Sequence, residues 1–452
     1  MAPSYSLPKF YRVKRSLGKS ESFDIIAAIC AEWTRLDLNQ VITDITKLSS
    51  ASMVEPSISA GAPTAPRIAI GVGSRGIYAL PLMVRHLVDL VKAAGASPFI
   101  VPAMGSHGGA TAEGQKEVLA SLGITEVTMG CAIEATMETV SVGNTAGGLP
   151  AYVDAIAAKA DGIMLLNRVK MHTSFHGPLE SGLHKMLSIG LGKEKAATLL
   201  HARGPEGLRD DMPEVARFLL TRLPFLAGFG IVENAYHRPV ALHALSATEM
   251  EKGERELLTL AKSLAPALPL EDLDVLVVEK MGKDISGTGM DTNVIGRLKI
   301  PGKSEPASPR IKTIVVLDLT EATHGNALGM GLADFTTQAM ADKVDFNLTG
   351  KNVLASGFLE RGRLPLVMKD SSEALDAAIV HAFRDRDGQK AEMKIEQKNE
   401  KKNNARILRI ASTLDLETFF VSENLIEEMR HLPGYLEESG PMDWEELDGE
   451  RA

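Results

Sequence analysis

The chain alternates between short apolar runs and longer amphipathic stretches. Arg67–Ile70 is an apolar run that ends in glycines, Pro81–Ala94 carries Leu and Val at helical spacing, and Pro98–Val101 is apolar again. This order predicts a strand, a helix and a strand. The alternation continues, and we predict a helix at Ala112–Leu122, a strand at Thr139–Val142, a helix at Ala151–Ala160 and a buried strand at Gly162–Leu166. Strands that alternate with helices build parallel sheets covered on both faces, so the pattern predicts an α/β fold.

A Pro-rich stretch at Ala265–Pro269 separates two such α/β segments and predicts a linker. We therefore expect two Rossmann-like α/β domains with mostly parallel sheets, residues 1–268 and 269–452, and a cleft between them. The acidic end from Glu437 is expected to fray. The remaining predicted elements are helices at Pro213–Arg222 and Thr248–Leu264, strands at Leu226–Val232, Val240–Leu245, Leu273–Val278 and Thr313–Leu317, helices at Leu332–Lys343 and Ser371–Phe383, and a charged solvated helix or loop at Arg384–Arg406.

Composition excludes several classes of protein. Apolar residues make up 44% and charged residues 24% of the chain, which is the mixture of a folded globular protein. The net charge of −9 and the lack of a basic stripe argue against a nucleic-acid partner. Cys30 and Cys131 are too few for a disulfide framework or a cysteine-based metal site. With no signal peptide and no long apolar run, we expect a cytoplasmic protein without a membrane partner.

A glycine loop follows the first predicted strand of the alternating pattern. Gly71–Gly76 spells G-x-G-x-x-G, a pattern that lets backbone N–H groups approach a phosphate. A dinucleotide fold also needs an acid at the end of the next strand, and that strand ends in Val101, Pro102 and Ala103. Pro81 further indicates that the helix begins several residues after the glycines. Arg75 within the loop is suited to holding an anion, and a conventional NAD-dependent dehydrogenase stays an alternative.

Two histidines follow predicted strands. His107 comes after the strand that ends at Val101, and His172 after the buried strand Gly162–Leu166. Ligands of α/β proteins bind at the carboxyl ends of parallel strands, so we expect both histidines to face one cleft. His172 and His176 enclose no acid, which disfavours a metalloprotease. His201 follows a helix-like stretch and could be a single imidazole ligand to a metal whose other donors come from elsewhere.

Several dispersed motifs, in this order, resemble those of the nickel-pincer-nucleotide-dependent 2-hydroxyacid racemases and epimerases, the lactate racemase-like family. The resemblance covers about residues 65–300 and is weaker beyond. The matching elements are Arg75, the Gly-x-His loop Gly105–His107, Gly148–Pro150, Ala160–Gly162, the Val-x-x-His element Val169–His172, the Ser-Gly-x-x-Lys element Ser181–Lys185, His201, and Asp291–Asn293 with Lys299.

The resemblance implies a bound nickel-pincer nucleotide, which is nickel pyridinium-3,5-bisthiocarboxylic acid mononucleotide. Residues 1–268 would bind this cofactor, and residues 269–452 would close the substrate cleft. The implied roles are covalent attachment for Lys185, nickel coordination for His201, contacts to the nucleotide phosphate for Ser106, Gly108 and Gly109, and a grip on the substrate carboxylate for Arg75 and Lys299. Proteins of cofactor biosynthesis would be partners.

Inverting the α-carbon of a 2-hydroxy acid by direct proton removal is difficult, and transient oxidation to a planar 2-oxo acid avoids it. This route needs two bases on opposite sides, and we assign His107 and His172 to them because imidazole exchanges protons near neutral pH. Three extra residues before Lys185 make His176 a competitor of His172. The family's frequent glutamine is Gly296 here and its frequent acid is Val72. A nucleotide- or nickel-binding protein without turnover stays a second alternative.

Overall fold

The structure is a computed structural model that describes residues 7–17, 22–51, 65–383 and 403–449. It divides into two units, an N-terminal unit of Ser20–Ala265 and a C-terminal unit that joins Met1–Lys19 to Pro266–Ala452. Both contain helices interleaved with a large, mostly parallel sheet, which confirms the predicted α/β fold. Among the described residues, no helix is long and apolar enough to cross a membrane.

The N-terminal unit is built on a six-stranded sheet in the order β4-β3-β2-β7-β8-β9. All its strands are parallel except β9, which runs antiparallel to β8. The chain passes from β2 to β3 on one side and later to β7 on the other, so the strand order reverses at β2. Such a reversal is where open α/β sheets bind ligands. The strands are β2 (Arg67–Val72), β3 (Ser97–Pro102), β4 (Ala132–Ile133), β7 (Gly162–Arg168), β8 (Phe225–Glu233) and β9 (Pro239–Leu245).

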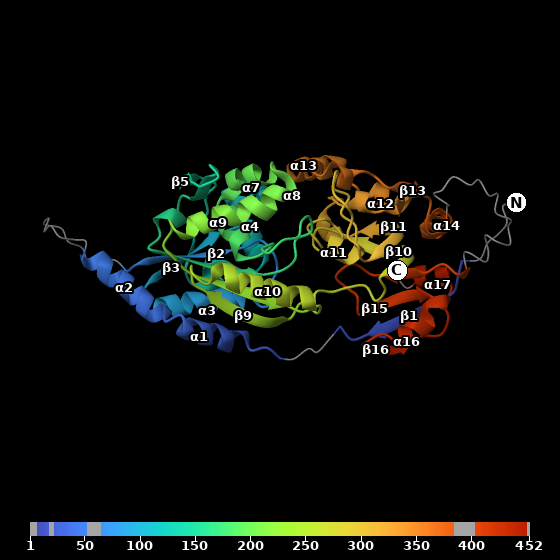
Figure 1. Cartoon of the computed structure of the whole chain (residues 1–452), viewed down its shortest axis with the longest axis horizontal. Coiled ribbons are helices and arrows are strands. Elements are labelled where there is room, and N and C mark those ends of the chain that lie inside the picture. Colours follow the sequence, from blue (N-terminus) through green and yellow to red (C-terminus); the bar gives the residue numbers. More distant parts are fainter. Residues whose placement is uncertain (1–6, 18–21, 52–64, 384–402, 450–452) are drawn as a thin grey trace. The chain divides into compact units, whose positions relative to one another are not determined.

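Helices cover both faces of this sheet (Figure 1). Alternate residues of β2 point to opposite faces, so Ile68 and Ile70 pack on one side and Ala69 on the other. The first face is covered by α1 (Ile25–Arg35), α2 (Leu38–Ala51) and α3 (Leu80–Ala93), and the second by α6 (Leu183–Lys185), α7 (Lys193–His201), α9 (Met212–Leu220) and α10 (Met250–Leu264).

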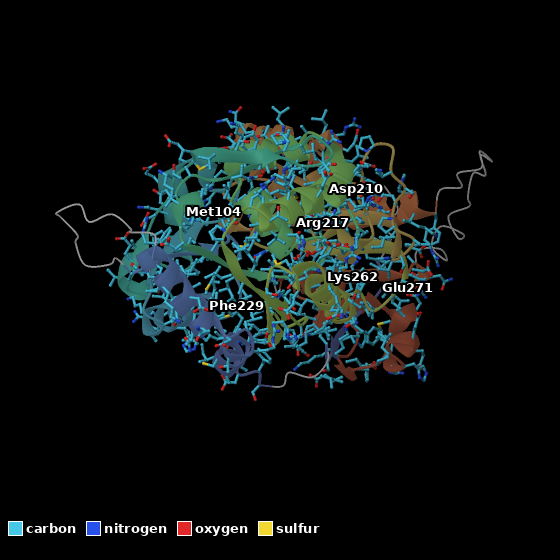
Figure 2. All side chains as sticks on the ribbon, turned by 60° about the vertical axis from the view of Figure 1, so that its left-hand side comes forward. Met104, Asp210, Arg217, Phe229, Lys262 and Glu271 are labelled. Atoms are coloured by element: carbon cyan, nitrogen blue, oxygen red, sulfur yellow. The ribbon has the colours of Figure 1, made fainter. Side chains whose placement is uncertain are left out.

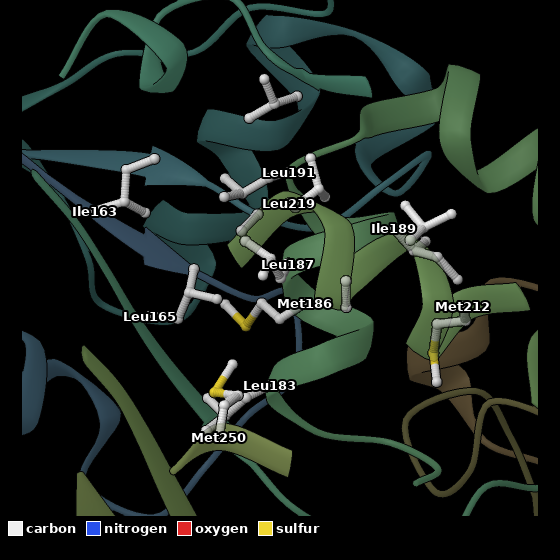
Figure 3. Close-up of a cluster of buried hydrophobic side chains, with 14 of the residues drawn as sticks. Ile163, Leu165, Leu183, Met186, Leu187, Ile189, Leu191, Met212, Leu219 and Met250 are labelled. Atoms are coloured by element: carbon white, nitrogen blue, oxygen red, sulfur yellow. The ribbon is translucent and has the colours of Figure 1, made fainter. Parts of the chain in front are cut away.

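The segment after α6 is central to the second core. Leu183, Met186 and Leu187 are buried against Ile163 and Leu165 of β7 (Figure 3). Phe229 of β8 belongs to the core on the opposite face of the sheet (Figure 2). The helix that carries Lys185 is therefore anchored by apolar packing directly against the sheet.

The predicted helix at Ala151–Ala160 is wrong. This segment forms strand β6 (Pro150–Asp154) followed by a short 3₁₀ turn at Ala157–Lys159. Strand β6 pairs antiparallel with β5 (Thr139–Asn144) in a separate two-stranded sheet. Alanine-rich composition favoured a helix, but buried Ala151 and Val153 lie two residues apart, which is strand spacing.

The C-terminal unit contains an eight-stranded sheet in the order β13-β12-β11-β10-β14-β15-β1-β16. The strands from β13 to β14 are parallel, and β15, β1 and β16 continue the sheet antiparallel. Strand β1 (Phe10–Arg15) thus belongs to this unit, whereas the sequence analysis placed it within residues 1–268. The other strands are β10 (Asp272–Met281), β11 (Arg310–Leu319), β12 (Phe335–Thr337), β13 (Leu366–Met368), β14 (Ile407–Ile410), β15 (Thr418–Ser422) and β16 (Tyr435–Glu438).

Two predictions in the C-terminal unit need correction. The predicted helix Leu332–Lys343 contains strand β12, and only Gln338–Asp342 forms helix α12, because Phe335 and the β-branched Thr336 and Thr337 pair with the neighbouring strands. The acidic end does not fray throughout, since it contains helix α17 (Trp444–Gly449) with a buried tryptophan. Helix α14 (Ser371–Ala382) is as predicted. Residues 384–402 of the charged segment lie outside the described residues.

We expect Trp444→Ala to lower the free energy of unfolding of the C-terminal unit by about 3–5 kcal/mol. The indole is 1% exposed, packs against Phe10 in a tilted arrangement at 5.3 Å between ring centroids and donates a 3.1 Å hydrogen bond to Ser371. Urea unfolding followed by circular dichroism measures the change. Leu436→Ala is the control, because Leu436 is 55% exposed and its replacement should change the free energy by less than about 0.5 kcal/mol. Equal losses in both variants would contradict the docking of α17.

Candidate active site

The glycine loop after β2 lies at the reversal of strand order. A Cβ at Gly71 would be 2.5 Å from a terminal methyl of Leu165, so a larger residue here would require the Leu165 side chain in β7 to shift. Helix α3 begins at Leu80, after Ala79 in a left-handed conformation, which confirms the late helix start predicted from Pro81. The loop between them presents an exposed Arg75. Its pKa is lowered by desolvation of the guanidinium and by the charge of Arg168.

His107 lies beside this loop. It follows β3 on an exposed turn, and its Nδ1 is hydrogen-bonded to the hydroxyl of Ser74, the residue before Arg75. A hydrogen bond at one ring nitrogen orients an imidazole and defines the chemistry of the other nitrogen. The contact therefore places one of the two predicted bases next to the predicted carboxylate-binding arginine.

The residues after His107 were predicted to contact the cofactor's nucleotide. Gly108 and Gly109 both have positive φ angles, of 67° and 66°. A Cβ at Gly108 would lie 2.5 Å from the backbone of Gly114 in helix α4 (Ala112–Ser121), so packing alone explains this glycine. Gly109 faces open space, and Ser106 is exposed. Their contact with a nucleotide stays a prediction.

Lys185 is partly buried at the end of α6. Burial, together with the nearby positive charges of Arg75 and Lys170, lowers the pKa of its amine to about 8. Within the described part of the chain, no acceptor lies within hydrogen-bonding or ion-pairing distance of the ammonium. Near pH 8 part of this amine is neutral and can act as a nucleophile, whereas an ordinary surface lysine is protonated at that pH.

His201 is the last residue of α7 and lies near Lys185. Its Nδ1 donates a 2.6 Å hydrogen bond to the carbonyl of Ala197, which leaves the lone pair of the neutral ring on Nε2. Desolvation lowers the pKa of His201, the bond to Ala197 opposes this, and the charge of Lys185 adds to the decrease. A neutral imidazole fixed by a backbone carbonyl has the form that binds metal ions.

The segment with His172 is organised by Glu180, which is 1% exposed. Its carboxylate accepts hydrogen bonds from the backbone N–H of His172 at 2.7 Å and of Gly177 at 3.2 Å. Lys262 of α10, labelled in Figure 2, forms a 2.7 Å ion pair with it. Burial raises the pKa of Glu180, but the hydrogen bonds from His176, Lys262 and His172 outweigh it and the pKa is lowered. The charged carboxylate thus fixes the loop that carries His172.

The rings of His172 and His176 differ in their surroundings. The ring of His172 packs against Phe175 at 4.4 Å between centroids, and its Nδ1 accepts a 3.1 Å hydrogen bond from the backbone of Ser174. The side chain of His176 is 48% exposed, and its Nδ1 lies 3.5 Å from Glu180. His172 is therefore the better fixed of the two histidines.

Lys299 belongs to the C-terminal unit, unlike the other predicted site residues. Its ammonium donates a 3.3 Å hydrogen bond to the carbonyl of Ala333 and lies 3.6 Å from Asp334. Burial lowers the pKa of Lys299, and Asp334 acts against this while Arg297 adds to it. An anionic substrate would have to compete with Asp334 for this lysine.

Electrostatic coupling joins the predicted residues of the N-terminal unit. The positive charge of Arg75 lowers the pKa of Lys185, and the charge of Lys185 in turn lowers the pKa of His201. The charge of Lys170, two residues before His172, also lowers the pKa of Lys185. The structure thus places Arg75 and His107 after the carboxyl ends of β2 and β3, the segment of His172 after β7, Lys185 close enough to Arg75 for their charges to interact, and His201 near Lys185. The concentration of cations suits an anionic ligand.

Sequence reasoning missed the residues that support this site. Ser74 lies inside the glycine loop and Glu180 immediately before the Ser-Gly-x-x-Lys element, and the sequence analysis gave neither residue a role. His184 lies inside the Ser-Gly-x-x-Lys element, but it is buried and its Nδ1 bonds to Glu254 at 2.6 Å, which ties α6 to α10. Apart from its position beside Lys185, no sequence signal distinguishes it from a site residue.

Comparisons with known proteins give limited overlap. No protein-family model matches the sequence, and a search of curated proteins gives no match. Among solved structures, the chain is similar to the lactate racemase apoprotein from Thermoanaerobacterium thermosaccharolyticum, with 13% sequence identity, a TM-score of 0.42, and coverage of 75% of this chain and 84% of that chain.

Proposed function

We propose that this protein is a racemase or epimerase that inverts C2 of a 2-hydroxy acid with a nickel-pincer nucleotide. One observation carries the proposal: Lys185, with a pKa of about 8 and no acceptor among the described residues, is close enough to Arg75 and to the metal-competent His201 for their charges to interact. Each of these residue types is required by the chemistry, and all three come from one cluster at the reversal of strand order. The lactate racemase-like sequence motifs fall on the same residues.

The side chains present fit the proposed cofactor. The neutral amine of Lys185 would form the covalent link, and Nε2 of His201 would coordinate the nickel alongside the sulfur and carbon donors of the pincer. Ser106 and Gly109 are accessible for a phosphate contact. When bound, the cofactor supplies a reversible acceptor for the α-hydrogen of the substrate.

The protein's own residues would bind the substrate and move its hydroxyl proton. The exposed guanidinium of Arg75 can hold the carboxylate through two parallel hydrogen bonds. His107, oriented by the hydroxyl of Ser74, can take the hydroxyl proton at Nε2 while its Nδ1–H donates to Ser74. This proton transfer and loss of the α-hydrogen together give the planar 2-oxo acid.

His172 would serve the opposite face. In the described arrangement Ser174 donates to Nδ1, so the neutral ring carries its proton on Nε2 and offers a hydrogen-bond donor to the substrate oxygen. To act as a base at Nε2, the ring must carry its proton on Nδ1 and give up the bond from Ser174. Substrate binding should therefore loosen the Ser174 contact.

The test is turnover by protein loaded with the cofactor. We expect interconversion of the two configurations at C2 without net consumption of NAD, because the α-hydrogen leaves and returns within one site. In deuterated water the product's α-position should stay largely protiated, as mass spectrometry can measure. Deuterium incorporation at each turnover would instead indicate carbanion chemistry through an exchanging base. NAD reduction without racemisation would support the dehydrogenase, and cofactor binding without turnover would support the carrier.

A further inference from the structure

A buried ion pair lies behind the loop that carries His107. Lys193 and Asp154 are both fully buried, and their charged groups are 3.1 Å apart. The ammonium also donates a 3.0 Å hydrogen bond to the side-chain oxygen of Gln115 and a further one to the carbonyl of Pro102. Gln115 is likewise fully buried, so three polar side chains form one network inside the N-terminal unit.

Burying the charged groups of this network costs free energy. Removing a lysine and a carboxylate from water is offset only when geometry and additional hydrogen bonds are favourable, and apolar side chains of similar volume often stabilise a core better. Lys193 also has a φ angle of +54°, which is unfavourable for a residue with a Cβ. A buried charge on a strained backbone is typical of a residue retained for positioning.

The network holds the backbone of the His107 loop through hydrogen bonds to its carbonyl groups. The Gln115 amide donates to the carbonyl of Gly105 at 2.8 Å and to that of His107 at 3.3 Å. Lys193 binds the carbonyl of Pro102, the last residue of β3. The loop is therefore tied at its beginning, middle and end to two buried side chains.

The same network reaches the elements that carry the other site residues. Lys193 is the first residue of α7, the helix that ends at His201. Gly105 donates a 3.1 Å hydrogen bond to the carbonyl of Gly190, in the turn that continues the helix of Lys185. One network thus connects the loop of His107 to the segments of Lys185 and His201.

We propose that Gln115 and Lys193 are positioning residues that fix His107 relative to Lys185 and His201. The kinetic part of this inference rests on the proposed function. Gln115 can be tested without leaving a buried charge unpaired, because it is neutral. Gln115→Met keeps the volume and removes both donors. Gln115→Glu keeps a partner for Lys193 but presents oxygen to the two carbonyls in place of N–H groups.

The first readout needs no cofactor. In both variants, the backbone amides of Gly105 and His107 should exchange hydrogen at least about tenfold faster than in the unsubstituted protein, as mass spectrometry with hydrogen exchange would measure. Leu119→Ala is the control, since Leu119 lies on the same helix, is fully buried and belongs to the apolar core. It should destabilise the unit without this local change. Unchanged exchange in both Gln115 variants, or equal acceleration in the control, overturns the proposal.

The second readout uses loaded protein. Both Gln115 variants should attach the cofactor at Lys185, keep KM, and lose kcat on the order of 10- to 100-fold, because a small displacement of a catalytic group is costly. The control should keep kcat. If kcat falls equally in Leu119→Ala, the role is structural and the proposal is overturned. If no variant and no unsubstituted protein racemises while local exchange changes as expected, the proposed function fails and the positioning of the loop stands.

Discussion

Alanine at His107 or at His172 should each lower the rate of racemisation by about 10²–10⁴-fold, in both directions, once the cofactor is loaded. Both directions suffer because each imidazole takes the proton from one enantiomer and returns it to the other. The measurement is the initial rate from each enantiomer, followed by chiral chromatography. Cofactor attachment at Lys185 should be unchanged, since neither ring is assigned to hold the cofactor.

His176→Ala is the matched control for these variants. His176 lies four residues from His172, is half-exposed and contacts the same carboxylate of Glu180. We expect it to lose less than about tenfold in rate. A larger loss for His176→Ala than for His172→Ala would transfer the base to His176. Losses below about tenfold for both His107→Ala and His172→Ala would remove these residues from the mechanism.

Lys185→Ala should abolish the covalent adduct that intact-mass spectrometry detects on the loaded protein, and with it all turnover. His201→Ala should keep the adduct and lose nickel, because only the metal ligand is removed. Metal analysis by plasma mass spectrometry separates the two variants. The same adduct mass on Lys185→Ala would place the attachment on another residue.

Attachment should also depend on pH. The amine of Lys185 is neutral above its pKa of about 8 and protonated below it, so the rate of adduct formation should rise with pH and level off above about 8. Arg75→Met removes a nearby cation that lowers this pKa, so the rise should move to higher pH. A rate that is flat from pH 6 to 9, or the same profile in both proteins, would contradict a depressed pKa at Lys185.

The spacing of apolar residues predicted most strands of both large sheets, but it did not predict the strand that pairs with Thr139–Asn144. Runs such as Gly162–Leu166 and Leu273–Val278 are buried on both faces, and their mainly apolar pattern, broken in the second run by Asp274 alone, identifies them without tertiary information. The segment Ala151–Ala160 is different, because its alanine-rich composition fits a helix, whereas its first residues form a strand paired with Thr139–Asn144. Local sequence does not encode that pairing.

The candidate site shows the same division. Arg75, His107, Lys185 and His201 stand in motifs that can be recognised from local sequence, and the structure brings them together. Gln115 and Lys193 bind each other although they lie 78 residues apart in the sequence. Both are polar, so the sequence alone would place them on the surface. For Lys299 a sequence motif predicted a role in substrate binding, but its ion pair with Asp334 could be found only from the folded structure.

The placement of β1 has a consequence for biosynthesis. Tyr11 of β1 contacts Glu423, 412 residues further along the chain, and β1 is held between β15 and β16. A ribosome releases β1 before the N-terminal unit and its partners β15 and β16 after that unit, so these strand pairs cannot form until β15 and β16 have been made. The N-terminal unit is continuous in sequence and can fold long before then. The N-terminal unit can therefore fold before the C-terminal unit, and β1 has to wait for partners that are made after that whole unit.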